Sequence, residues 1–121
     1  MPSFVKCSTK VDVNKQMAIP TNFIKHLPRY QGRETILFPV HDVSGNVWES
    51  FGYYIRTEGP DYPKPIFQGD WRKYVCVKRL TSGDRVIFRV EENADGVARY
   101  TIAAQRRRVN FGETIGWSEE F

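Results

Sequence analysis

Apolar and polar residues alternate along several short stretches of this 121-residue chain, which is the pattern of β-strands with one buried face. The clearest stretch follows Arg85, where Val86, Phe88 and Val90 share one face of the predicted strand. The same reasoning predicts strands over residues 4–10, 36–40, 47–55, 85–90 and 99–105. Short strands at this spacing, joined by glycine-containing turns, are typical of a barrel or a sandwich.

Two short helices are predicted between these strands. The first begins where Thr21 or Asn22 would cap its free N–H groups, and it ends at Pro28. The second follows Gly69 and turns three side chains inward, Trp71, Tyr74 and Val75. Three prolines stiffen the loop over residues 57–65 and exclude a helix there. The pattern therefore predicts an all-β fold, an antiparallel barrel with helices at its ends.

The composition favours one aromatic-rich core. Three Trp, six Tyr and eight Phe suit strands better than a helical bundle. No stretch approaches the ~20 apolar residues that cross a bilayer, and the first residues lack the apolar run of a signal peptide. Cys7 and Cys76 are expected as free thiols, and with His26 and His41 scattered between them they make no metal-ligand pattern. We therefore expect no metal and no cofactor.

The charge is unevenly distributed along the chain. The net charge is +4, from eighteen basic and fourteen acidic residues, but residues 109–121 contain three glutamates and no Lys or Arg. Residues 1–108 therefore carry +7, which attracts polyanions. The acidic end is predicted either to be disordered or to be pinned to the barrel by Phe111 and Trp117.

Five short stretches between residues 4 and 88 carry a recognisable combination of motifs. In chain order they are Phe4-Val5-Lys6; Asp12-Val13 with Met17-Ala18-Ile19-Pro20; Lys25-His26-Leu27-Pro28; Asp42-Val43-Ser44-Gly45-Asn46-Val47-Trp48; and Gly69 to Val75 with Leu80 to Phe88. Each motif is weak alone. Together they resemble the plant B3 DNA-binding domain over residues 4–108.

This resemblance implies a seven-stranded open barrel capped by two short helices. It also implies sequence-specific binding of double-stranded DNA, with two arms inserted in the major groove. One arm follows the first strand, and the other precedes the second helix. Residues 1–108 would form the DNA-binding domain of a nuclear transcription regulator, and residues 109–121 an acidic tail. No membrane and no small-molecule substrate is expected.

Both expected arms supply polar and cationic side chains. Lys and Arg neutralise phosphates, whereas amide and guanidinium groups also pair with base edges. The candidate DNA-binding residues are Lys6, Thr9, Lys10, Asn14, Lys15 and Gln16 in the first arm and Arg56, Tyr62 and Lys64 in the second. Arg56 matches a DNA-contacting arginine of the auxin-response branch of the family, and its fork suits guanine O6 and N7.

Other interpretations remain open at this point. Glu58 and Asp61 oppose phosphate attraction in a lengthened second arm, which motivates a protein-interaction module that has lost DNA binding. An enzyme would need a cysteine–histidine pair, but Cys76 is expected to be buried on the second helix and no triad motif occurs. Residues 106–108, all arginine, would contact the DNA backbone, serve in nuclear import, or end the last strand in solvent.

Overall fold

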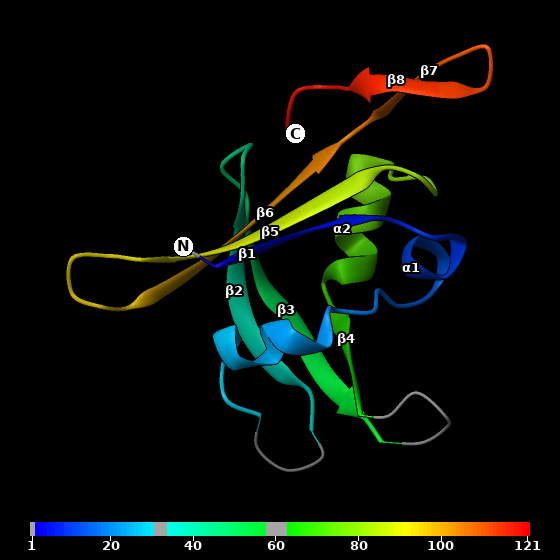
Figure 1. Ribbon diagram of the computed structural model, residues 1–121. Helices are drawn as coiled ribbons and strands as arrows, with labels where there is room; N and C mark the ends of the chain where they lie inside the picture. The colour runs from blue at the N-terminus through cyan, green and yellow to red at the C-terminus, as the bar shows by residue number, and fades with distance from the viewer. Residues whose placement is uncertain (1, 31–33, 58–62) are drawn as a thin grey trace.

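The computed structural model describes residues 2–30, 34–57 and 63–121 (Figure 1). In chain order the elements are β1 (Ser3–Cys7), α1 (Lys10–Asn14), the 3-10 helix η1 (Thr21–His26), β2 (Ile36–Asp42), β3 (Val47–Arg56), β4 (Lys64–Gly69), α2 (Trp71–Lys78), β5 (Arg85–Glu92), β6 (Ala98–Gln105), β7 (Arg107–Asn110) and β8 (Glu113–Trp117). No helix in these ranges is long and apolar enough to span a membrane.

Six of the strands form one strongly curled sheet in the order β1-β5-β6-β2-β3-β4. The sheet is an open half-barrel, because β1 and β4 remain unpaired with each other at its two ends (Figure 1). The predicted all-β open barrel is therefore confirmed. In detail, the described strands number eight instead of seven, because β7 and β8 form a separate hairpin, and β2 runs parallel to β6.

The inside of the curled sheet is filled with aromatic rings. Phe88 lies at its centre, and six rings surround it at centroid distances of 5.2–6.5 Å: Phe4, Phe23, Phe38, Phe51, Phe67 and Tyr100. Trp71 and Tyr74 are fully buried, as predicted. Trp48 is only half-buried and meets Tyr74 edge to face. This close-packed interior supports the loops that leave the ends of the strands.

Strand β4 was not predicted, because its prolines suggested a loop. Pro65 is nevertheless buried inside the strand. A proline cannot donate to a ladder and is tolerated on the edge of a sheet, and β4 is an edge strand. The free side of β4 bonds instead to the segment before η1, where the Ile19 N–H donates to the Pro65 carbonyl (2.9 Å) and the Phe67 N–H to the Met17 carbonyl (2.9 Å).

Two predictions about the helices were wrong. The first helix is a 3-10 helix that begins at Thr21 itself after Pro20, so neither Thr21 nor Asn22 caps it with a side chain. Cys76 is exposed, because α2 turns Trp71, Tyr74 and Val75 inward and Cys76 outward. The inward positions of α2 match the prediction.

A buried carboxylate joins the β2–β3 turn to α2. Asp42 accepts hydrogen bonds from the Trp48 indole (3.0 Å) and the Asn46 N–H (3.0 Å), and Lys78 of α2 lies 3.4 Å away. Burial alone would raise the pKa of Asp42, but the bonds from Trp48 and Asn46 and the charge of Lys78 together lower it below its usual value. Burial, together with the charge of Asp42, raises the pKa of Tyr74.

Gly69 sets the path from β4 into α2. Its φ of +66° lies in the left-handed region, and a Cβ there would overlap the carbonyl oxygen of Ser50. The same corner is closed by Asp70, whose N–H donates to Ser50 O (3.0 Å) and whose carboxylate accepts from Ser50 N (2.9 Å). β3 and the start of α2 are therefore locked together.

We predict that Gly69→Ala destabilises the protein much more than Gly45→Ala. Gly45 also has a positive φ (+87°), but nothing lies within 4 Å of a Cβ built on it. Gly45→Ala should therefore cost only the left-handed strain, about 1–2 kcal/mol, whereas Gly69→Ala adds an overpacking cost of about 1–3 kcal/mol. Urea unfolding of both variants measures the difference. Equal losses of unfolding free energy in the two variants would contradict the close approach between Gly69 and Ser50.

Candidate nucleic-acid interface

The first arm, residues 8–19 between β1 and η1, contains the short helix α1. The strand predicted over residues 4–10 is therefore shorter than expected, because β1 ends at Cys7 and Lys10 begins α1. Thr9 caps this helix, because its hydroxyl accepts from the Asp12 N–H (3.1 Å) while the Asp12 carboxylate accepts from the Thr9 N–H (2.9 Å). This reciprocal pair is a capping box. The Thr-x-x-Asp spacing is visible in the sequence and could have predicted the helix.

Asp12 fixes the shape of this arm. Its side chain is almost fully buried and accepts from the Lys6 ammonium at the end of β1 (3.0 Å) and from the Ala18 N–H where the chain returns (3.3 Å). Its carbonyl accepts from the buried indole of Trp71 (2.9 Å). Sequence reasoning had not assigned Asp12 a role. A single residue thus ties both ends of the first arm to β1 and α2.

The second arm, residues 56–64, runs from the last residue of β3 to the first residue of β4. Arg56 and Lys64 are cross-strand partners at the mouth of this arm. Ala18 of the first arm bridges to Ile66 of β4, next to the two backbone hydrogen bonds already described. The bases of the two arms are therefore joined directly through main-chain bonds.

A hollow of about 480 Å³ lies where the two arms meet. Six of the nine predicted DNA-binding residues line it: Lys6, Thr9, Lys15, Gln16, Arg56 and Lys64. Lys10 and Asn14 are exposed on α1 but do not line this hollow. Tyr62 lies outside the described residues, as do Glu58 and Asp61.

The lining residues differ in what they offer a ligand. The Lys6 ammonium is bound to Asp12 and to the Ala18 carbonyl (2.9 Å), and the Thr9 hydroxyl serves the capping box, so both contribute to the shape of the arm. Lys15 and Arg56 are exposed, and Lys64 is half-buried. Sequence reasoning missed Arg72 of α2, which donates to the Asn14 carbonyl and lines a small adjoining hollow with Lys15. The face is therefore cationic on both arms.

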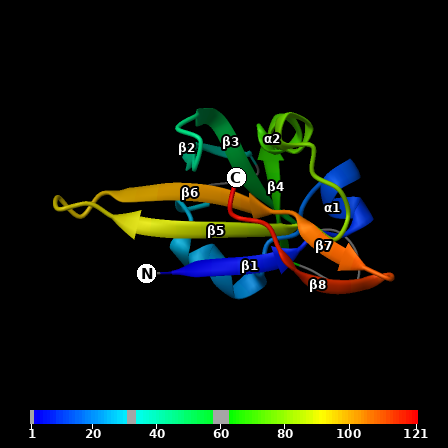
Figure 2. The same ribbon diagram turned by 90° about the horizontal axis from the view of Figure 1, so that it is seen from above.

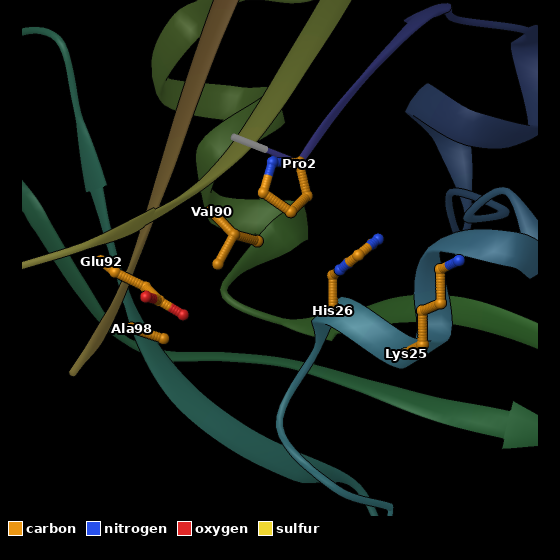
Figure 3. Close-up of a pocket in the computed structure, with 6 residues that line it drawn as sticks. All are labelled: Pro2, Lys25, His26, Val90, Glu92 and Ala98. Carbon is orange, nitrogen blue, oxygen red and sulfur yellow. The ribbon is translucent and has the colours of Figure 1, made fainter. Parts of the chain in front are cut away.

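A second hollow, of about 510 Å³, lies near the N-terminus (Figure 3). Lys25 and His26 of η1 face Glu92 of β5 across it, with Pro2, Val90 and Ala98 completing the lining. Its charges are mixed, unlike those of the hollow between the arms. Among the residues described, no group of three or more His, Cys, Asp or Glu side chains could hold a metal ion.

Comparison with known proteins supports the fold. No protein-family model and no curated protein matches the sequence. Among solved structures, Arabidopsis FUS3 in complex with DNA matches with a TM-score of 0.64 and 22% identity, over 85% of this chain and 95% of that one. The hypothetical Arabidopsis thaliana protein At1g16640.1 matches with a TM-score of 0.54 and 18% identity, over 85% and 88%. The chain therefore has the fold of these B3 domains, which confirms the fold expected from the sequence motifs.

We predict that Asp12→Ala lowers the free energy of unfolding by about 3 kcal/mol, because it leaves the Lys6 ammonium and two N–H groups without their buried acceptor. It should also remove hydrogen-exchange protection from the Thr9 and Ala18 amides. Asp95→Ala, in the exposed β5–β6 turn, is the control and should stay within about 0.5 kcal/mol of the parent protein. Similar losses for the two variants would show that Asp12 does not organise the arm.

Proposed function

We propose that this protein is a B3-family module that binds double-stranded DNA in a sequence-specific manner and acts as a transcription regulator in the nucleus. The observation that carries the proposal is the convergence of cations from two separate arms on one hollow. A fold shared with a protein solved in complex with DNA supports it. The body charge of +7 supplies the long-range attraction that a polyanion needs.

The two arms suit different parts of a duplex. In the proposed complex both enter the major groove, which is wide enough to admit an α-helix or a β-ribbon. Lys10 and Lys15 on the first arm neutralise phosphates, and the Asn14 and Gln16 amides contact adenine edges. On the second arm the guanidinium of Arg56 contacts guanine O6 and N7, and Lys64 contacts phosphate.

The hydrogen bonds within the site favour recognition by a preorganised surface. α1 is capped by Thr9, its carboxylate Asp12 is buried, and the arm is bonded to β4 at Ala18. Side chains on such a framework lose less conformational entropy on binding than those on an unconstrained loop. Sequence preference needs this rigidity, since a wrong base is rejected only when the reading group cannot move to another partner.

We predict that Arg56→Ala weakens binding and relaxes the preference at one base pair by ~1–3 kcal/mol, because one bidentate contact to a guanine is lost. Fluorescence anisotropy with a duplex selected from a random pool, and with its single-base variants, measures both effects. The matched control is Arg99→Ala, which removes the same charge from the start of β6, outside the hollow between the arms. It should leave the base preference unchanged.

The outcomes separate three possibilities. Uniform weakening across all bases would make Arg56 a phosphate contact instead of a base reader. Failure to enrich any duplex, with a response to salt much flatter than the slope of about −0.9 expected per neutralised phosphate, would contradict DNA binding. That result would favour the alternative of a protein-interaction module on the same barrel.

A further inference from the structure

The hairpin of β7 and β8 projects from the end of the curled sheet. Among the described residues it forms a sheet of its own, and it points to the same side of the molecule as α1 in both views (Figures 1 and 2). Its tip carries Phe111, which is 97% exposed, with φ +51° followed by Gly112 at +79°. Phe111 therefore does not pin this segment to the barrel.

A buried carboxylate fastens the start of the hairpin. Asp84 is 2% exposed and accepts from the Arg106 guanidinium (2.6 Å) and from the Arg107 N–H (3.2 Å). Arg106 also donates to the carbonyls of Arg79 (2.8 Å) and Lys78 (3.2 Å). Of the three consecutive arginines, Arg106 is thus a structural residue.

The segment after the hairpin is fastened as well. The Arg85 guanidinium lies 4.0 Å from the centroid of the Trp117 ring, and Phe121 exchanges two backbone hydrogen bonds with Ala104 (3.0 and 2.9 Å). Glu120 forms a bidentate ion pair with Arg89 (2.8 and 3.1 Å), and this pair lowers the pKa of the Glu120 carboxyl. The hairpin is therefore held at both ends and projects in a defined direction.

The hairpin's attachment point is also the base of the first arm. The Asp84 carbonyl accepts from the Ser8 N–H (2.8 Å), and the Ser8 carbonyl accepts from the Gly83 N–H (2.8 Å). Thr9, the cap of α1, follows Ser8 directly. The Arg107 side chain packs over this turn, with its Nε 3.3 Å from the position that a Cβ on Gly83 would occupy. The hairpin and the first arm thus leave the body from one hydrogen-bonded corner.

We propose that the β7–β8 hairpin is a third DNA-contacting element, in which Arg107 and Arg108 bind backbone phosphates flanking the base pairs that the two arms read. Both arginines are exposed, whereas Arg106 is occupied by Asp84. Two cations on a rigid support beside the first arm extend the cationic face along a duplex. The proposal rests on the DNA binding proposed above. The hairpin would raise the affinity and lengthen the bound DNA site without reading bases, because phosphate contacts carry no direct sequence information.

The test compares duplexes of two lengths. One contains only the sequence selected from a random pool, and the other adds flanking base pairs of arbitrary sequence on both sides. Three proteins are compared: the parent chain, the double variant Arg107→Gln/Arg108→Gln, and the control variant Arg99→Gln. Arg85 and Asp84, which fasten the two ends of the hairpin, are unchanged in all three. Urea unfolding midpoints check that each protein remains folded.

On the long duplex, loss of two phosphate contacts should reduce the magnitude of the log–log salt slope by about 1.8. Between 50 and 200 mM salt the parent protein should then lose about tenfold more affinity than the double variant. On the short duplex the two should have equal slopes. Arg99→Gln should keep the slope of the parent protein on both.

Two results would overturn the hairpin proposal while leaving DNA binding intact. The first is that the parent protein binds the long duplex no more tightly than the short one. The second is that the double variant shows the same salt slope as the parent protein on the long duplex. A parent protein that binds neither duplex would instead contradict the proposed function itself.

Discussion

The buried carboxylate of Asp12 is the interaction on which the candidate site depends. A charged group in an apolar interior is costly unless ion pairs and hydrogen bonds satisfy it, and here Lys6, Thr9 and Ala18 do so from three points of the chain. The buried carboxylate thus constrains the shape of the first arm, because these contacts are made in the conformation that brings the arm beside β4.

Buried carboxylates paired with a cation also organise two other turns of the molecule. Asp42 organises the β2–β3 turn and receives Lys78 from α2, and Asp84 organises the turn before β5 and receives Arg106 from the start of the C-terminal hairpin. Asp12, Asp42 and Asp84 are the buried acidic residues among those described. The aromatic core gives a rigid body, whereas these carboxylates fix where the chain leaves that body and in which direction it points.

The sequence predicted the body better than the arms. Alternation around Phe88 and the inward positions of α2 identified the core strands and the second helix, because burial on one face imposes a period on the sequence. β4 was not predicted, because a proline such as Pro65 is tolerated in a strand at the edge of a sheet. Whether a strand lies at an edge depends on the whole sheet and cannot be inferred from the segment alone. Lys6 was predicted as a DNA contact from its charge and its place in the expected first arm. Its partner Asp12 is six residues away, and only the folded arm brings the two together.

We infer that Asp12 holds the two arms in positions from which they bind one ligand together. The most direct test is an NMR titration of the protein with duplex DNA, following the amides of residues 9–16, Arg56, Lys64 and Ile66. We expect the amide signals of both arms to shift together with one dissociation constant, while the amides around Lys25 and His26 stay unchanged. Shifts confined to one arm, or centred on the hollow at His26, would contradict it.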